Sequence, residues 1–264
     1  MKKAVLLPDI HHPFHNRKAV RAVLRFIKWF QPDIVVLMGD ALEMRAIDHW
    51  KKEKRNLKYF ENVRLLHDYQ EFDKDILKPI ERLVPNARKI YLAGNHEHWA
   101  VTGVNNCNPQ LEGLTEPENV LRLKERGWEW IPFIGKHGKR GFIKLGKLTL
   151  VHGHYTNKYH SAKTADTYSK STAYGHTHDI QLYTKVHVED PTDYHCAMSI
   201  GCLCDKSPEF LWGQPNRWVH AFGIMYIRPG GAYNLYVPVI IKGEFSYAGK
   251  NFNGNYRKKR RKTS

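Results

Sequence analysis

The sequence has no long hydrophobic run. No stretch approaches the roughly 18 apolar residues that a transmembrane helix needs, so we expect no segment that spans a membrane and no membrane partner. The chain starts MKKAVLLPDI, with two lysines and an apolar stretch, but AVLL is too short for the hydrophobic core of a signal peptide. We therefore expect a cytoplasmic protein.

Cysteine is scarce, and repeats and flexible linkers are absent. Three of the four cysteines, Cys196, Cys202 and Cys204, lie in HCAMSIGCLC without C-x-x-C spacing. We expect free buried thiols there, with zinc ligation as the alternative. Because no stretch is rich in proline, glycine or serine, we predict one domain over residues 1–250 and a basic, disordered tail over residues 251–264.

Acidic residues are few relative to basic ones. The chain has 26 Asp and Glu against 42 Lys and Arg, which gives a net charge of +16. Six consecutive cations, RKKRRK at residues 257–262, belong to the predicted tail, and without them the net charge is still +10. Such an excess predicts a polyanionic partner or an acidic substrate rather than a membrane.

The hydrophobic pattern predicts an α/β protein. In the first half, short apolar runs at residues 3–8, 33–38 and 88–93 predict strands, and helical spacing predicts helices over residues 16–30 and 59–84. This alternation is typical of parallel βαβ units. The second half is richer in strands: we expect a hairpin in GFIKLGKLTLVHGH, a short helix over residues 158–168, and strands in QLYTKVHV, HCAMSIGCLC, WVHAFGIMYI and AYNLYVPVII.

Five of the predicted strands end in a small group of polar side chains. The groups are Asp9-Ile10-His11, Gly39-Asp40, Gly94-Asn95-His96-Glu97, His152-Gly153-His154 and Gly175-His176-Thr177-His178. Because the carboxyl ends of strands form the ligand crevice of an open α/β sheet, we expect these groups to converge on one site. Carboxylate, amide and imidazole ligands together favour transition-metal ions, and a pair of such ions activates water for attack at phosphorus.

These groups resemble the ordered motifs of the calcineurin-like metallophosphoesterases. The family signature reads D-x-H, G-D-x-x-[DE], G-N-H-[ED], a lone histidine and G-H-x-H. The matching segments are DIH at 9–11, GDALE at 39–43, GNHE at 94–97, His152 and GHTH at 175–178. The resemblance covers about residues 3–180 and implies a β-sandwich flanked by helices, with four α/β/β/α layers.

The resemblance also implies a role for each motif residue. It makes Asp9, His11, Asp40 and His178 ligands of one divalent ion, and Asp40, Asn95, His152 and His176 ligands of a second, with Asp40 bridging. Manganese is the ion we expect first, with iron, zinc or nickel as alternatives. A hydroxide bridging the ions would be the nucleophile. His96 would be the catalytic histidine that is not a ligand, and Glu43 would orient it.

Two departures from the family motifs narrow the range of expected substrates. Protein serine/threonine phosphatases of this superfamily carry an arginine in the second motif and another just before GNHE. Met44 and Ala93 occupy these positions here, which argues against a phosphoprotein substrate.

Several other residues near the motifs carry chemistry. The histidines outside the ligand set are expected to support the site or lie at the surface; they are His12, His15, His98, His154 and His160. The segment HYTNKYHSAKT at 154–164 is either a solvated helix or a lid whose His154, Lys158 and Lys163 bind substrate. The segment HWKKEKRNLK at 49–58 is either a charged face or a rim for a phosphate backbone.

We therefore predict a metal-dependent phosphoesterase that hydrolyses phosphodiester bonds in DNA or RNA. The alternatives are a small phosphomonoester or a cyclic nucleotide as substrate. A further alternative is a non-catalytic interaction scaffold, which is disfavoured because all seven expected ligand positions are intact.

Overall fold

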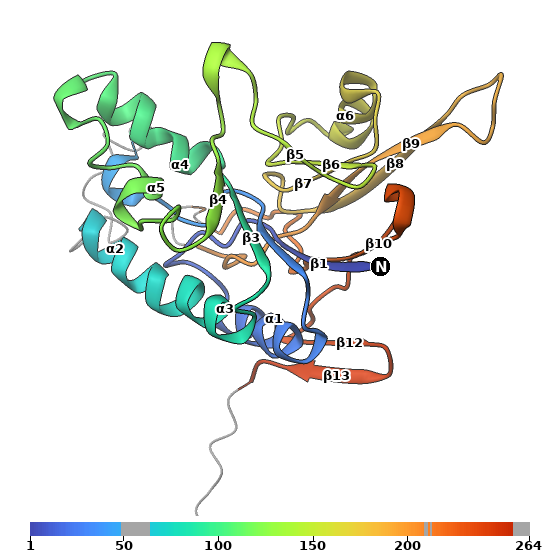
Figure 1. The fold of residues 1–264 in the computed structure, drawn as a ribbon, viewed down its shortest axis with the longest axis horizontal. Coiled ribbons are helices and arrows are strands. Elements are labelled where there is room, and N and C mark those ends of the chain that lie inside the picture. The colour runs from blue at the N-terminus through green and yellow to red at the C-terminus, as the bar shows by residue number, and fades with distance from the viewer. Residues whose placement is uncertain (49–63, 209–210, 212, 256–264) are drawn as a thin grey trace, which may run out of the picture.

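The apolar run at the start of the chain forms a central strand of a six-stranded sheet (Figure 1). The structure is a computed structural model that describes residues 1–48, 64–208, 211 and 213–255. The sheet has the order β11-β10-β1-β2-β3-β4. Strands β1 to β4 are parallel, and β10 and β11 are antiparallel to their neighbours. The bounds are β1 Lys2–Leu7, β2 Ile34–Leu37, β3 Arg88–Leu92, β4 Trp128–Ile131, β10 Gly223–Ile227 and β11 Tyr233–Tyr236.

Helices cover the outer face of this sheet, as the βαβ pattern predicts. Helix α1, Arg17–Phe30, begins where the Asn16 side chain accepts a hydrogen bond from the Ala19 amide at 2.9 Å. We expected one helix over residues 59–84. The structure has α2, Leu65–Phe72, and α3, Lys78–Leu83, joined by a π-helical turn over Asp73–Leu77; residues 59–63 lie outside the described part.

Shorter helices lie between the third and fourth strands. Helix α4, Asn95–Trp99, begins directly after β3 and continues into a π-helical turn over Ala100–Asn105. Helix α5, Pro117–Val120, precedes β4.

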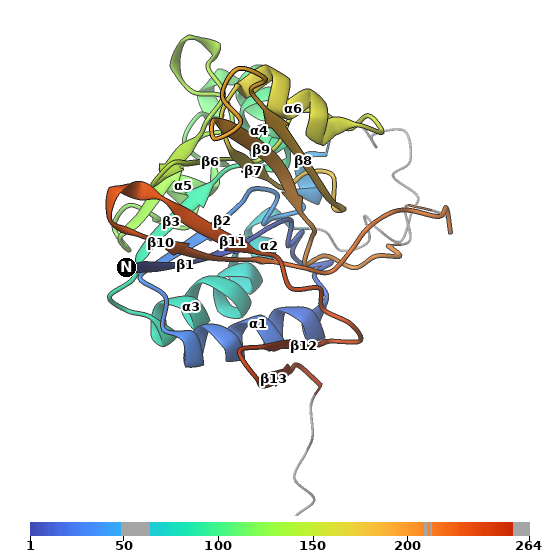
Figure 2. The same ribbon diagram turned by 90° about the vertical axis from the view of Figure 1, so that its right-hand side faces the viewer.

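The strand-rich second half forms a five-stranded sheet of order β5-β6-β7-β9-β8. The predicted hairpin is present as β5 and β6, and β6, β7 and β9 are parallel to one another. The bounds are β5 Ile143–Leu145, β6 Leu148–Val151, β7 Thr172–Tyr174, β8 Ile180–Val186 and β9 Tyr194–Ile200. Helix α6, His160–Tyr168, covers the far face of this sheet (Figure 2).

Alternation along the strands divides the core into layers. In β1, Ala4 and Leu6 face the second sheet, while Val5 and Leu7 pack with α1, α2 and α3. Leu148 and Leu150 of β6 complete the layer between the sheets, and Val151 and Tyr174 pack toward Ala165 of α6. The four-layer α/β/β/α sandwich is therefore confirmed.

The C-terminal part of the described chain is a hairpin. Strands β12, Glu244–Tyr247, and β13, Lys250–Asn253, pack on α1, where Phe26 contacts the rings of Phe245 and Phe252 at 5.7 and 5.1 Å between centroids. We expected the disordered tail from residue 251, whereas residues 251–253 belong to β13. The cationic run at 257–262 lies outside the described residues.

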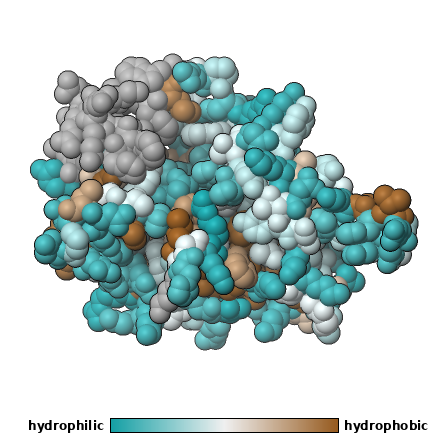
Figure 3. All heavy atoms as spheres, turned by 90° about the horizontal axis from the view of Figure 1, so that it is seen from above, coloured by the Kyte–Doolittle hydropathy of each residue, from teal (hydrophilic) through white to brown (hydrophobic). Residues whose placement is uncertain are grey.

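The surface seen from above is mostly hydrophilic, with apolar atoms gathered at its right-hand end, where the β8–β9 hairpin projects (Figure 3). Val186 and Val188 are exposed in this hairpin. Within the described residues no helix is both long enough and apolar enough to cross a membrane.

Candidate metal centre

The site lies where the two sheets meet, at the carboxyl ends of parallel strands. Asp9 and His11 follow β1, Asp40 follows β2, and Asn95 follows β3. The second sheet supplies His152 after β6 and His176 and His178 after β7. All seven expected ligands come together, in two groups of facing donor atoms that share this edge of the sandwich.

The first group contains Asp9, His11 and His178, whose donor atoms all lie within 4.8 Å of one another. His178 Nε2 is 3.1 Å from His11 Nε2 and 3.3 Å from Asp9 Oδ1. Two ligand atoms at about 2.1 Å from one tetrahedral ion would be about 3.4 Å apart, so these separations fit a shared metal ion.

The second group contains Asp40, His152 and His176. His152 Nε2 lies 3.1 Å from Asp40 Oδ2 and 3.0 Å from the Asn95 side-chain oxygen. The same Asp40 oxygen lies 3.8 Å from His11 Nε2 of the first group. Asp40 therefore occupies the position between the groups that a bridging carboxylate requires.

Backbone groups and a carboxylate orient these imidazoles. The Met38 carbonyl is 2.9 Å from His152 Nδ1, and Glu43 Oε2 is 2.6 Å from His11 Nδ1. Each contact turns Nε2 of the same ring toward the other ligands and favours the tautomer that leaves Nε2 free to bind an ion. The Asp9 carboxylate is held by the His176 amide, which donates to it at 2.9 Å.

Close backbone approach and left-handed conformations shape the loops. A Cβ atom at Gly94 would overlap Asp40, and one at Gly175 would overlap Asp9, so both motif glycines are required by space. Five ligand residues themselves have positive φ, between 45° and 69°. They are Asp9, His11, Asp40, His176 and His178.

The buried charges are strongly coupled. Burial opposes ionisation of Asp40, but His152 and His96 beside it hold the pKa of its carboxyl well below the usual range. Burial likewise opposes charging of His152, and the Asp40 carboxylate overcomes this and raises the pKa of His152 to about 9. Burial lowers the pKa of His176 to about 4. The metal-free site thus holds a proton on His152 at neutral pH, which a divalent ion would displace.

His96 lies beside the second group. Its amide donates to Asp40 Oδ1 at 2.9 Å, and its Nε2 is 3.9 Å from Asp40 Oδ2. Its Nδ1 is 2.9 Å from the backbone carbonyl of Glu43 but 3.6 Å from the Glu43 carboxylate. The expectation that Glu43 orients His96 stays a prediction: both its carbonyl and, at the longer distance, its carboxylate face this ring, and the carboxylate also binds His11.

The predicted substrate-binding residues stand apart from the cluster. His154, Lys158 and Lys163 are not among the residues that line the cavity beside the ligands. His154 is exposed, and Lys158 and Lys163 lie over the rings of Tyr159 and Tyr155 at 5.1 and 4.4 Å. The short helix expected over residues 158–168 is present as α6, and within the described residues no hydrogen bond or ion pair joins these three side chains to the metal ligands.

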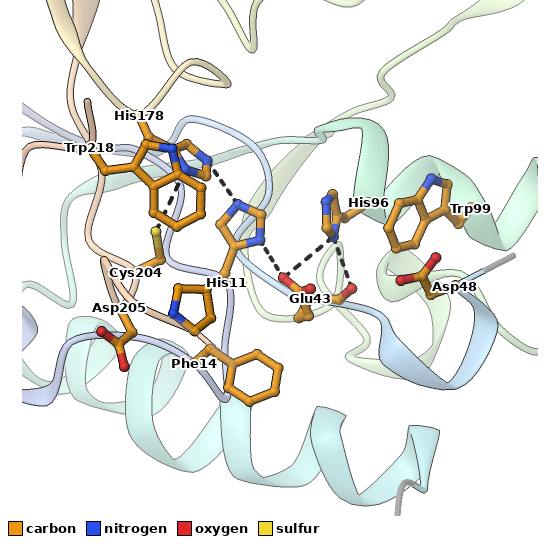
Figure 4. A pocket seen from close by; sticks show the side chains of 11 residues that line it. His11, Phe14, Glu43, Asp48, His96, Trp99, His178, Cys204, Asp205 and Trp218 are labelled. Carbon is orange, nitrogen blue, oxygen red and sulfur yellow. Dashed lines mark hydrogen bonds and ion pairs between the residues drawn. The ribbon is translucent and has the colours of Figure 1, made fainter. Parts of the chain in front are cut away.

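A cavity of about 270 Å³ opens beside the ligands and was not predicted (Figure 4). Trp99 lies against His96 with 4.0 Å between ring centroids, and Trp218 lies against His178 with 4.3 Å. His11 lies between these two indoles, and Phe14 also lines the cavity. Glu43, Asp48 and Asp205 also line it, so the cavity combines aromatic rings, imidazoles of the site and acidic side chains.

Two further residues escaped the sequence analysis. Glu97 is buried and accepts hydrogen bonds from the amides of Asp40, Leu42 and Gly94 at 2.8–3.0 Å, so it ties the second and third ligand loops together. Because Glu97 is the last residue of the GNHE motif, its position in the sequence could have indicated a role in the site. Cys204 Sγ is 3.8 Å from His178 Nδ1.

The structure also bears on the expectation of free, buried cysteine thiols. Cys202 and Cys204 are free and buried, whereas Cys196 is free but only half-buried, so the expectation of a buried thiol is wrong for Cys196. With His178, Cys202 and Cys204 have donor atoms close enough to hold an ion, so the zinc alternative has the right residue types in place.

Comparisons with known proteins agree with this geometry. The model of the family described as calcineurin-like phosphoesterase matches residues 2–221. The chain belongs to the calcineurin-like phosphoesterase family. It is 24% identical over 270 residues to the gene 54 protein of Mycobacterium phage L5, covering 94% of this chain and 98% of that one. The gene 54 protein of Mycobacterium phage D29 is 25% identical over 270 residues, covering 94% and 97%.

Solved structures with a similar fold include Vps29 proteins. A single mutant of Vps29 from Entamoeba histolytica has a TM-score of 0.43 and 13% identity, with 96% of this chain and 99% of that chain covered. Vacuolar Protein Sorting 29 from Cryptosporidium parvum has a TM-score of 0.47 and 12% identity, with 96% and 98% covered. Members of the family typically bind two divalent metal ions, and the two ligand groups supply candidate sites for both.

Proposed function

We propose that the protein is a two-metal phosphodiesterase that hydrolyses nucleic acid. The observation that carries the proposal is the aromatic cavity placed directly against the ligand groups, because stacking platforms beside a phosphate-cleaving site suit nucleotides. The net charge of +16 supports the choice of a polyanion.

The residues fit two transition-metal ions. Carboxylate and imidazole donors are present in both groups, and the second group also has the Asn95 amide oxygen, at separations near 3 Å. When bound, two such ions would supply an activated water or hydroxide and stabilise the charge that develops on the phosphoryl oxygens. We propose manganese first, with iron, zinc or nickel as alternatives.

His96 is positioned to hand a proton to the leaving oxygen. Its Nδ1 faces the Glu43 carbonyl, an acceptor that fixes the proton on Nδ1 in the neutral ring. A protonated ring would present Nε2–H on the side of Asp40, where the scissile phosphate would lie. Trp99 stacks on the same ring and limits its rotation.

The Trp218 indole would hold a base beside the scissile phosphate. Trp218 is partly exposed where it lies against His178, so it can offer a face to a planar group, whereas Trp99 is only 7% exposed and lines the cavity beside His96 (Figure 4). Stacking of a base on an aromatic side chain contributes about 1–3 kcal/mol and tolerates any base. We propose that cleavage has little sequence preference.

An activity panel with the manganese-loaded protein tests the proposal. The substrates are single- and double-stranded DNA, RNA, cyclic nucleotides and p-nitrophenyl esters. We expect a higher kcat/KM on a polynucleotide than on any small ester. Turnover confined to small phosphomonoesters or cyclic nucleotides would overturn the nucleic-acid assignment while leaving a metal-dependent hydrolase.

Deleting residues 257–264 tests the role of the cationic tail. We expect weaker binding of DNA or RNA and a shallower salt dependence, because fewer phosphate contacts release fewer counterions. Hydrolysis of a p-nitrophenyl ester should not change. A chain with the six cations replaced by glutamine is the matched control for length; equal loss on both substrates would assign the tail a structural role.

A cyclic nucleotide or another small diester is the second candidate. The cavity volume of about 270 Å³ lies just below the roughly 300–1,000 Å³ typical of small-molecule sites, which favours a compact diester. The same panel separates the two substrates.

A further inference from the structure

A second group of ligating side chains lies on the other side of the loop that carries Asp9 and His11. His12 and His15 stack with 4.8 Å between ring centroids and an interplanar angle of 12°. Asp75 faces them from the π-helical turn that joins α2 to α3. One donor atom from each of the three residues lies within 4.8 Å of the others.

Hydrogen bonding does not account for this arrangement. His12 Nε2 is 3.5 Å from Asp75 Oδ2, which is at the outer limit for a hydrogen bond. Nδ1 of both His12 and His15 is buried without a hydrogen-bond partner in the protein. Only 2% of the His12 surface is exposed, so water does not readily replace a partner for this ring.

The same separation suits two ligands of one ion. Nitrogen and oxygen ligands at about 2.0–2.1 Å from a tetrahedral ion lie about 3.4 Å apart, close to the observed 3.5 Å. Two imidazoles and one carboxylate form a donor set that binds zinc and neighbouring transition metals. His15 and Asp75 are half-buried, which leaves room for a water molecule as a fourth ligand.

We propose that His12, His15 and Asp75 bind a third divalent transition-metal ion, separate from the pair at the strand ends. This assignment does not depend on the proposed function. It reverses our expectation that His12 and His15 support the site or lie at the surface. The separation is physical: His11 points into the binuclear cluster, whereas His12 points toward the helices and contacts Phe72.

The ion would hold the ligand loops against the helical layer. The backbone of His12 donates to the Ala41 carbonyl at 2.9 Å and accepts from the Glu43 amide at 3.0 Å, so His12 is joined to the loop that follows β2. Its side chain would be tied through the metal to the turn at Asp73–Leu77. π-Helical turns recur at functional sites in proteins, in keeping with a ligand at Asp75.

Ion counting in a chain that lacks the binuclear centre tests the assignment. The Asp40→Ala protein is loaded with Zn²⁺, dialysed and analysed for metal. We expect the count to fall by one ion per chain when Asp75→Asn or His15→Gln is added. The control is Glu71→Gln, which removes a nearby helical carboxylate that pairs with Lys74 and should leave the ion in place.

Metal analysis does not require the protein to be an enzyme. The result therefore tests the third metal site separately from the proposed phosphodiesterase activity. If Asp40→Ala does not fold, the comparison is made in the otherwise unchanged chain, where Asp75→Asn should lower the count from three ions to two. Co²⁺ in the Asp40→Ala protein should give visible absorption that Asp75→Asn abolishes. An ion count unaffected by both Asp75→Asn and His15→Gln would overturn the proposal.

Discussion

The two sheets contribute unlike halves to the candidate binuclear centre. The loops after β1, β2 and β3 supply both carboxylates and the amide oxygen, together with His11 and His96. The loops after β6 and β7 supply imidazoles: His152, His176 and His178. The first sheet thus supplies the negatively charged ligands, including the carboxylate placed to bridge the two groups. The second sheet supplies the imidazoles that complete each group.

Neither sheet alone provides a complete ligand group. His178 faces Asp9 at 3.3 Å, and His152 faces Asp40 at 3.1 Å, so each ligand group takes members from both sheets. The apolar layer between the sheets, which includes Leu6 and Leu150, therefore sets the metal geometry as well as stability. The comparison teaches that a core substitution far from the ligands can act on metal affinity.

Removing the bridging carboxylate should have the largest effect. We expect Asp40→Ala to lose both ions of the binuclear centre, because one Asp40 oxygen lies within 4 Å of ligand atoms from both groups. His176→Ala, in the second half, should lose one ion and keep the other. Metal analysis and turnover of the two variants measure the difference; one fully occupied strand-end site in Asp40→Ala would contradict the bridging role.

Removing His96, the proposed proton donor, should affect rate without affecting metal content. We expect His96→Ala to lower kcat by roughly 10²–10⁴-fold, the usual contribution of a positioned acid. The loss should shrink for esters with good leaving groups, which need no proton. If metal analysis shows that an ion is lost, His96 is a ligand.

Weakening the support of one ligand should have a smaller effect. Glu43→Gln removes the charged acceptor that lies 2.6 Å from His11 Nδ1, and we expect roughly a 10–100-fold loss of metal affinity in the first ligand group. Isothermal titration with Mn²⁺ measures it. Glu129→Gln, which removes a surface pair with Arg88, is the control. Unchanged affinity with a slower rate would instead link Glu43 to His96.

Metal binding should release a proton from His152, which belongs to the second sheet. The pKa of His152 is raised to about 9 in the metal-free protein, so at pH 7 this ring holds a proton that metal binding must displace. Metal affinity should therefore rise as the pH increases from 7 toward 9. Titration of Mn²⁺ in buffers of different ionisation enthalpy measures the release, which should decline above pH 9 and be smaller in His152→Ala. The remainder comes from His11, where burial opposes charging but the Glu43 carboxylate outweighs this effect and raises the pKa.

Most strand positions and the ligand set were accessible from the sequence. Short apolar runs ending in Asp, Asn or His identify β1, β2, β3, β6 and β7. Polar side chains are costly to bury at strand ends unless they have partners, so the pattern is informative before any packing is known. A continuous helical pattern over residues 59–84, however, cannot reveal a π-helical turn at Asp73–Leu77, because the apolar face continues through it.

Side-chain direction and remote loops were not accessible. Glu43 was assigned to the right region, but whether its carboxylate or its backbone meets His96 depends on the left-handed turn at Met44 and its surroundings. Trp218 lies in a segment without a motif and reaches the cavity only because the chain before β10 folds back over His178. Such contacts depend on tertiary packing between distant segments.

The left-handed backbone at five ligand residues has a consequence for how the protein can evolve. Each such residue other than glycine costs of order 1–3 kcal/mol, less for Asp and His, which tolerate this conformation better than most. Glycine at Asp9, His11, Asp40, His176 or His178 would relieve the cost and remove a ligand in the same step. Activity and thermal stability are therefore in direct opposition at these positions, and a lineage released from selection for catalysis would be expected to accumulate glycine there.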